Sequence, residues 1–166
     1  MSTITALGKT GSTRASFTRP ANTTQYAAGD TMSDSAAVMT FPKALKEFSG
    51  AIQQAILVDS ANQSTLLDAE LWLFDTAPAV PTDNAAIAFT DAELARLIGV
   101  ISFASVDSKV GIPTSGADGN VVNVQSGLGI PVVGLRTNDI YGVLVARNAY
   151  TPVSGEIFTV ILQMVY

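Results

Sequence analysis

Alternation between apolar and polar positions is the clearest pattern along the chain. In residues 156–165 every second side chain is large and apolar, namely Phe158, Val160, Leu162 and Met164. Residues 66–75 show the same period of two. This period is typical of a β-strand, because successive side chains of a strand point to opposite faces of a sheet. Further strands are predicted between positions rich in Gly, Pro, Asn and Ser, at residues 36–41, 50–59, 100–104, 121–125, 130–135 and 140–147.

A single short helix is predicted near residues 90–98. Thr90 is followed three positions later by Glu93, the pair that forms a capping box at a helix N-terminus. Leu94, Leu97 and Ile98 follow at helical spacing, and the next residue is a glycine, which favours the end of a helix. Strands do not alternate with helices, so a parallel sheet is not expected. The sequence predicts an all-β fold, an antiparallel β-sandwich of jelly-roll-like type.

Residues 1–35 differ in composition and are predicted to form an extended N-terminal arm, with residues 36–166 forming the sandwich domain. Small residues dominate the segment, and its large apolar residues are few: Ile4, Leu7, Phe17, Tyr26 and Met32. Such a segment buries too little apolar surface to offset the entropy lost on ordering. We therefore expect an arm that is either disordered or laid across a partner.

Composition narrows the classes of function. The 166 residues fit one domain and include neither cysteine nor histidine. This excludes thiol nucleophiles, cysteine-ligated metals and histidine bases, and we expect no cofactor. The basic residues are scattered and the net charge is −5, which disfavours nucleic acid and anionic membranes as partners. Charged residues are only 14% of the chain, which favours a surface that meets other protein; a neutral, alanine-rich domain is the alternative.

Three patterns resemble sites but lack residues that the chemistry needs. Gly8-Lys9-Thr10 resembles the end of a phosphate-binding loop, yet Thr3 stands where that loop requires glycine. Asp118 is the single carboxylate of the loop at residues 109–120, which favours a hairpin turn over calcium binding. Asp68 and Glu70 lie about 7 Å apart by strand rise, and a solvated strand face explains them better than a hydrolase site. The chain is therefore predicted not to be an enzyme.

Two further residues have simple structural interpretations. Trp72 is the only tryptophan, and packing in the core explains it better than a sugar-binding platform, which would need several exposed aromatic residues. Arg147 ends an apolar strand, where it is expected to form a surface salt bridge or a contact between subunits.

Several stretches resemble a group of small structural proteins from the virions of tailed phages. The similarity spans about residues 15–165 and identifies a family rather than one protein. The stretches that carry it are 17–30 (FTRPANTTQYAAGD), 71–74 with 77–78 (LWLF and AP), 81–86 (PTDNAA), 89–94 (FTDAEL), 141–147 (YGVLVAR) and 149–152 (AYTP).

The resemblance implies a structural role without catalytic residues, and we expect capsid decoration, also called cementing. The protein would be made in the host cytoplasm and would bind the major capsid protein on the outer surface of the virion capsid, as a homotrimer. Phe17, Arg19 and Tyr26 of the arm, together with Arg147, are the candidate interface residues. The alternatives are another phage component, such as a head–tail connector or a tail or fibre-associated module, and a carbohydrate-binding β-sandwich.

Overall fold

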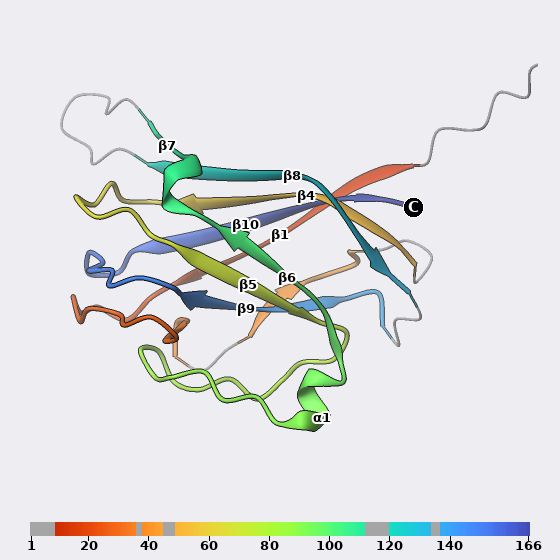
Figure 1. The fold of residues 1–166 in the computed structure, drawn as a ribbon, viewed down its shortest axis with the longest axis horizontal. Helices are drawn as coiled ribbons and strands as arrows, with labels where there is room; N and C mark the ends of the chain where they lie inside the picture. The colour runs from red at the N-terminus through yellow and green to blue at the C-terminus, as the bar shows by residue number, and fades with distance from the viewer. Residues whose placement is uncertain (1–8, 36–37, 45–48, 112–119, 134–136) are drawn as a thin grey trace, which may run out of the picture.

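Two antiparallel sheets pack face to face in the computed structural model, which describes residues 9–35, 38–44, 49–111, 120–133 and 137–166 (Figure 1). The first sheet has the order β1 (Thr10–Thr18), β10 (Ile157–Val165), β4 (Gly50–Asp59), β8 (Val121–Val132) and β7 (Ser108–Val110). The second has the order β2 (Thr31–Met32), β9 (Ile140–Ala146), β5 (Ala69–Phe74) and β6 (Leu97–Phe103), and β3 (Met39–Phe41) also pairs with β9. The predicted all-β sandwich is confirmed.

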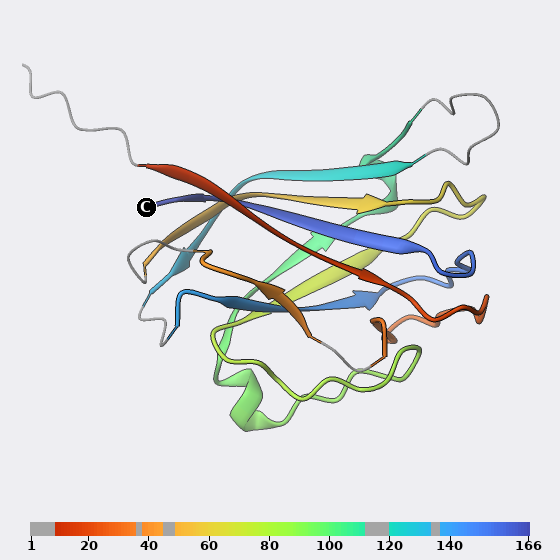
Figure 2. The same cartoon turned by 180° about the vertical axis from the view of Figure 1, so that it is seen from behind.

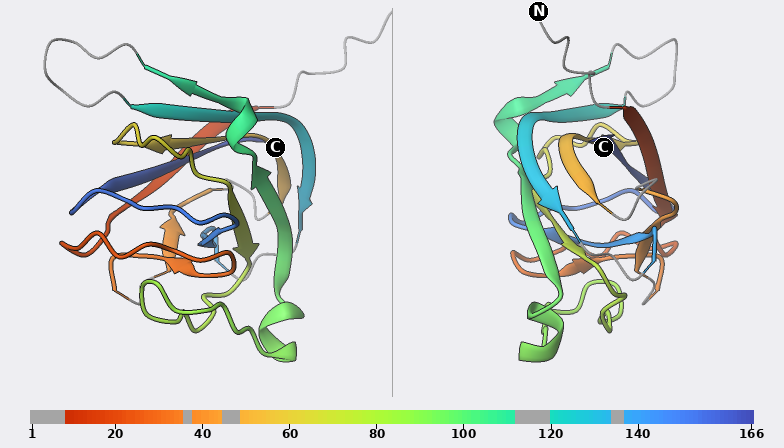
Figure 3. Two further views of the ribbon diagram at one scale, coloured as in Figure 1. Left: turned by 60° about the vertical axis from the view of Figure 1, so that its left-hand side comes forward. Right: turned by 90° about the vertical axis from the view of Figure 1, so that its right-hand side faces the viewer.

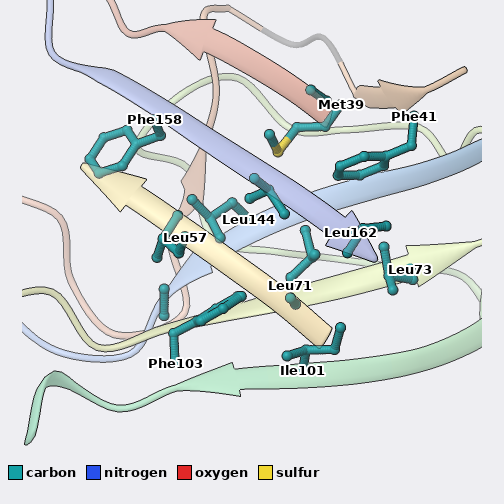
Figure 4. Packing of buried hydrophobic residues seen from close by; sticks show 14 of the residues in the cluster. Met39, Phe41, Leu57, Leu71, Leu73, Ile101, Phe103, Leu144, Phe158 and Leu162 are labelled. Atoms are coloured by element: carbon teal, nitrogen blue, oxygen red, sulfur yellow. The ribbon is translucent and has the colours of Figure 1, made fainter. Parts of the chain in front are cut away.

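The core lies between the two sheets and follows from the alternation in the sequence. The four large apolar residues predicted to share one face of residues 156–165 are all buried in β10. Leu57 of β4 and Leu162 of β10 face Leu71 of β5 and Leu144 of β9 across the sandwich (Figure 4). Strands β5 and β10 thus contribute every second side chain to a shared apolar layer. Burial of this layer is the main favourable contribution to folding.

A second apolar cluster covers the outer face of the second sheet. Phe74, Val143 and Val145 are buried there beneath the segment that joins β5 to the α-helix α1 (Asp91–Leu94). Phe89 of this segment packs edge-on against Phe74, with ring centroids 4.9 Å apart, and lies 5.5 Å from the ring of Trp72. Trp72 is half-buried in this outer cluster rather than in the central core. The segment and α1 lie on the opposite side of the molecule from β7 and β8 (Figure 3).

The predicted N-terminal arm is wrong for residues 9–35, which belong to the sandwich. β1 pairs with β10 along its whole length, from Thr10 opposite Val165 to Thr18 opposite Ile157 (Figure 2). An edge strand needs only backbone hydrogen bonds and a modest inner face, so the small residues of β1 suffice. Tyr26 is also buried, and its backbone forms an isolated antiparallel β-bridge with Tyr150. Residues 1–8 lie outside the described residues.

The predicted helix begins where expected but ends early. Thr90 and Glu93 form the capping box: the Thr90 hydroxyl accepts a hydrogen bond from Glu93 N, and the Glu93 carboxylate accepts one from Thr90 N. The helix ends at Leu94, and Leu97 and Ile98 belong to β6. Leu97 pairs with Phe74 of β5, and Ile98 lies in the bulge between this pair and the next. This tertiary pairing prevails over local helical spacing.

The two strands predicted at residues 121–125 and 130–135 are one strand, β8. A β-bulge opposite β4 accommodates residues 127–129, where Gly127 and Gly129 have φ values of 70° and 60°. Glycine adopts this left-handed conformation without strain, so the strand passes the irregularity and resumes its pairing. Residues 134–136 lie outside the described residues. The loop predicted at residues 109–120 begins inside β7, and its residues 112–119 are not described.

Gly142 of β9 lies close against two side chains of the core. A Cβ atom at this position would lie 2.8 Å from Phe41 Cε2 and 3.0 Å from Leu71 Cδ1. Both neighbours are fully buried and have little room to move. We expect Gly142→Ala to lower the free energy of unfolding by about 1–3 kcal/mol through overpacking. Urea unfolding followed by circular dichroism measures the change, and an unaltered midpoint would contradict it.

Candidate functional site

A buried arginine binds the N-terminal residues to the loop that covers the second sheet. Arg19 is 2% exposed and directly follows β1. Its Nε donates to Tyr26 Oη at 2.9 Å, and its Nη2 lies 3.3 Å from Asp83 Oδ2. Asp83 Oδ1 accepts from Tyr26 Oη at 2.6 Å and from the backbone of Ser33 at 3.1 Å. We call Arg19, Tyr26 and Asp83 the arginine cluster.

Within the arginine cluster, the guanidinium of Arg19 is surrounded by groups of the protein itself. The guanidinium carbon of Arg19 lies 5.0 Å from the centre of the Tyr26 ring, and Nη1 donates to the backbone oxygen of Asn22 at 2.6 Å. Burial, followed by the hydrogen bond to Asp83, raises the pKa of the Tyr26 hydroxyl, so Tyr26 stays neutral. The open depression of about 420 Å³ beside the cluster is lined by Asp83 but not by Arg19. The guanidinium is therefore committed to internal bonds.

A second buried cluster contains two carboxyl groups that share one tyrosine, and we call it the carboxyl pair. Asp59 ends β4 and Glu156 precedes β10; they are 5% and 1% exposed. Tyr150 Oη hydrogen-bonds to Asp59 Oδ2 at 2.8 Å and also to Glu156 Oε1. A hydroxyl has one proton and can donate to only one of them. The other contact is favourable only if its carboxyl group carries a proton.

The electrostatics of the carboxyl pair agree with this geometry. Burial first, and then the neighbouring Glu156, raise the pKa of Asp59 to about 8. Burial and the charge of Asp59 likewise raise the pKa of the Tyr150 hydroxyl. The remaining oxygens accept backbone hydrogen bonds, Asp59 from the backbone of Ala61 and Glu156 from that of Val153, each at 2.8 Å. The carboxyl pair therefore holds loop backbone in place while it retains a proton at neutral pH.

Arg147 forms the predicted surface salt bridge. Its Nη2 lies 2.5 Å from Glu70 Oε2, and the same carboxylate accepts a hydrogen bond from Trp72 Nε1 at 3.0 Å. Asp68 points elsewhere and accepts from the backbone of Ser105 at 2.6 Å. The structure therefore does not combine Asp68 and Glu70 into one acid pair.

The other candidate interface residues lie mostly inside the protein. Phe17 is half-buried, and its ring centroid lies 5.6 Å from that of Phe158. The prediction that Arg19 and Tyr26 form contacts of an extended arm is wrong, because both are buried in the arginine cluster. Of the four candidates, Arg147 is the most exposed, and it already pairs with Glu70.

The outer face of the first sheet is the surface that the sequence interpretation missed. On the three middle strands, β10, β4 and β8, its outward positions are mainly aliphatic, and no described segment packs over them as Phe89 packs over the second sheet. We call this surface the aliphatic face; its residues are Ile56, Val58, Val122, Val124, Ile157 and Ile161. A signal was present, because the second set of alternating residues in β10 includes the large aliphatic residues Ile157 and Ile161 beside the polar Thr159 and Gln163. A solvated antiparallel sheet normally presents polar residues outward.

Comparison with known proteins does not assign a family: no family model and no curated protein matches the chain. Among the described residues, no helix is long and apolar enough to span a membrane. Groups of three or more potential metal ligands are likewise not found in the part of the chain that the structure describes.

Proposed function

We propose that this chain is a structural virion protein of a tailed phage that binds the assembled capsid lattice and stabilises it from outside, as a homotrimeric decoration or cement protein. The aliphatic face is the observation that supports this proposal most directly. Val124 and Ile157 of this face are exposed, and its other four residues are partly exposed. A contiguous apolar surface on a folded protein is typical of a site that meets another protein. The resemblance to small phage virion proteins supports the choice of a capsid lattice as that other protein.

A cement protein works through mass action. It favours the assembled shell because it binds the lattice and has no complete binding surface on free subunits. A trimer strengthens this effect, since three contacts of moderate affinity act together once the first is made. A rigid sandwich suits such binding, because little conformational entropy is lost when a preformed sheet face docks.

A carbohydrate-binding role has less support. Trp72 is the aromatic residue that such a module would present, but it is half-buried, packs on Phe89 and donates its indole hydrogen to Glu70. Among the described residues, the two most buried groups of ionisable side chains, the arginine cluster and the carboxyl pair, are occupied by internal hydrogen bonds. Internal contacts thus account for these polar groups, whereas no internal contact among the described residues accounts for the outward side chains of the aliphatic face.

The copy number of the protein in purified virions tests the proposal. A decoration protein is expected at a number comparable with that of the major capsid protein, and particles made without it should lose their genome at lower temperature. Quantitative mass spectrometry of the virion measures the first quantity and thermal release of DNA measures the second. A copy number typical of a single ring at one vertex would favour a connector, and absence from the virion would refute a structural virion role.

A further inference from the structure

We propose that the carboxyl pair is a proton-dependent latch: while it keeps a proton it holds the loop at residues 150–156 against the end of β4, and loss of that proton releases the loop while the two sheets stay paired. This inference goes beyond the proposed function and does not depend on it. Three features of the described residues carry it: the hydrogen bonds of the pair, the side chains around it, and the unequal attachment of its two carboxyl groups to the fold.

The hydrogen bonds of the carboxyl pair need two protons. Tyr150 Oη contacts a carboxyl oxygen on either side, Asp59 Oδ2 at 2.8 Å and Glu156 Oε1. Burial raises the pKa of the Tyr150 hydroxyl, so this group keeps its own proton and donates it to one of the two. A second proton, on the other carboxyl group, makes the remaining contact a hydrogen bond. When this second proton is lost, two oxygen atoms face each other without a hydrogen between them, and two negative charges remain buried.

No basic side chain pairs with either carboxyl group among the described residues. Their salt bridges are formed by Arg19, Arg96 and Arg147, each with a carboxylate outside the pair. Arg19 does approach Glu156, but through its backbone amide, which donates to the Glu156 carbonyl oxygen at 3.0 Å. Its guanidinium belongs to the arginine cluster and is bound there.

The other surroundings of the pair are neutral. Asp59 lines a cavity of about 10 Å³, and the remaining walls carry no titratable group; they are formed by Leu57, Leu67, Ser108, Val121 and Asn123. On the side of Tyr150, the ring centroid of Phe158 lies 6.3 Å from that of the tyrosine, and Tyr26 pairs through its backbone. A second negative charge buried without a cation is strongly unfavourable. The repulsion is therefore relieved when one carboxyl group moves into water.

The two carboxyl groups are attached to the fold unequally. Asp59 lies in the sheet, opposite Phe158 of β10 on one side and Val121 of β8 on the other. Glu156 lies outside the strands, directly after Gly155, whose φ of 69° belongs to a tight turn. A residue paired on both sides moves only when strand pairing is broken, whereas a loop residue can move in a local opening. The loop that carries Glu156 is therefore the part that is released.

Release of this loop would break backbone hydrogen bonds that join it to the chain after β1. The amide of Arg19 donates to the Glu156 carbonyl oxygen, and the amides of Tyr26 and Tyr150 donate to each other's carbonyl oxygens at 2.9 and 3.2 Å. The amides of Arg19 and Tyr150 therefore report opening of the latch. The amides of residues 71–73, in the middle of β5, report unfolding of the sandwich, because β5 is paired with both β6 and β9.

Hydrogen exchange of these amides, followed by NMR at pH 6, 7 and 8, tests the inference. Protection factors remove the pH dependence of the intrinsic exchange rate and give the equilibrium constant for opening at each amide. We expect Arg19 and Tyr150 to open about tenfold or more readily than residues 71–73 at every pH. Opening that releases one proton should also become about tenfold more favourable per pH unit. The pKa of Asp59, raised by burial to about 8, marks the end of this increase.

Asp59→Asn should keep the latch closed over this range, because an amide cannot lose the proton that the pair needs. Its opening at Arg19 and Tyr150 should differ by less than about twofold between pH 6 and 8. Asp107→Asn, at an exposed carboxylate directly before β7, is the matched control and should retain the increase of about tenfold per pH unit. Glu156→Gln removes the other ionisable member of the pair, and it takes the place of Asp59→Asn if that variant does not fold.

Three results would overturn the inference. If Arg19, Tyr150 and residues 71–73 share one equilibrium constant for opening at each pH, the protein opens only as a whole and there is no latch. If Arg19 and Tyr150 open more readily than β5 but equally at pH 6 and 8, or if Asp59→Asn retains the increase, the carboxyl pair does not control the loop. The proposed function is decided separately, by the copy number in virions and the thermal release of DNA.

Discussion

Arg19→Ala is expected to lower the free energy of unfolding by about 3–5 kcal/mol, the cost of leaving a buried charge without its partner. The side chain of Asp83 is only 7% exposed and would lose the cation that faces it. Tyr26 would keep its hydrogen bond to Asp83 but would lose the bond and the packing that it receives from Arg19. Urea unfolding at fixed protein concentration, followed by circular dichroism, measures this loss.

Arg147→Ala is the matched control for this prediction. Arg147 also pairs with a carboxylate, Glu70, but the two side chains are 34% and 25% exposed. Solvent screens such a pair, and its removal should cost no more than about 1 kcal/mol. Similar losses for Arg19→Ala and Arg147→Ala would show that burial does not set the strength of the arginine cluster. The double variant Arg19→Met with Asp83→Asn should lose less than Arg19→Ala, because it leaves no unpaired charge.

The strands that the sequence predicts best are those in which apolar and polar residues alternate clearly enough to identify the strand without its partners. β4 occupies residues 50–59 as predicted, and the inward set of β10 is the predicted one. Such strands lie in the middle of a sheet, where one face must be apolar, so their burial is visible in the sequence. β1 has no such signal, because its place depends on hydrogen bonds to β10, which is far along the chain. Composition alone therefore suggested an arm.

The buried polar clusters escaped prediction for a related reason. Arg19 and Asp83 are 64 positions apart, and Asp59 and Tyr150 are 91 positions apart. A local pattern cannot show which distant polar residue will satisfy a buried one, since the fold brings them together. The capping box at Thr90 and Glu93 was predictable because both partners lie within one helical turn. For the aliphatic face, the sequence shows the aliphatic residues of β10. It does not show whether another segment packs over them, because that depends on the fold.

The free energy of unfolding is expected to fall as the pH rises from about 4 to about 8, through the carboxyl pair. The pKa of Asp59 is raised from its ordinary value of 3.8 to about 8 in the folded protein. Between these values the folded state keeps a proton that the unfolded chain has released, so removing protons favours unfolding. The contribution is complete below about pH 4, where both states are protonated, and is lost as the pH rises through about 8. A single proton gives a slope of at most about 1.4 kcal/mol per pH unit.

Asp59→Asn should flatten this dependence and make the protein more stable than the unaltered chain at pH 8. The amide cannot ionise, and its nitrogen can donate to Tyr150 Oη while Tyr150 donates to Glu156, which reproduces the protonated arrangement. Asp107→Asn, at an exposed position, should leave the slope unchanged. Urea unfolding at several pH values between 5 and 8 compares the three proteins. Hydrogen bonds from Thr90 lower the pKa of Glu93. A carboxyl group of this kind stabilises the folded protein at higher pH and loses that effect only as the pH falls. Glu93 therefore does not cause the free energy of unfolding to decrease between pH 5 and 8. An equally steep decrease in Asp59→Asn and in the unaltered protein would show that Asp59 holds no proton at neutral pH.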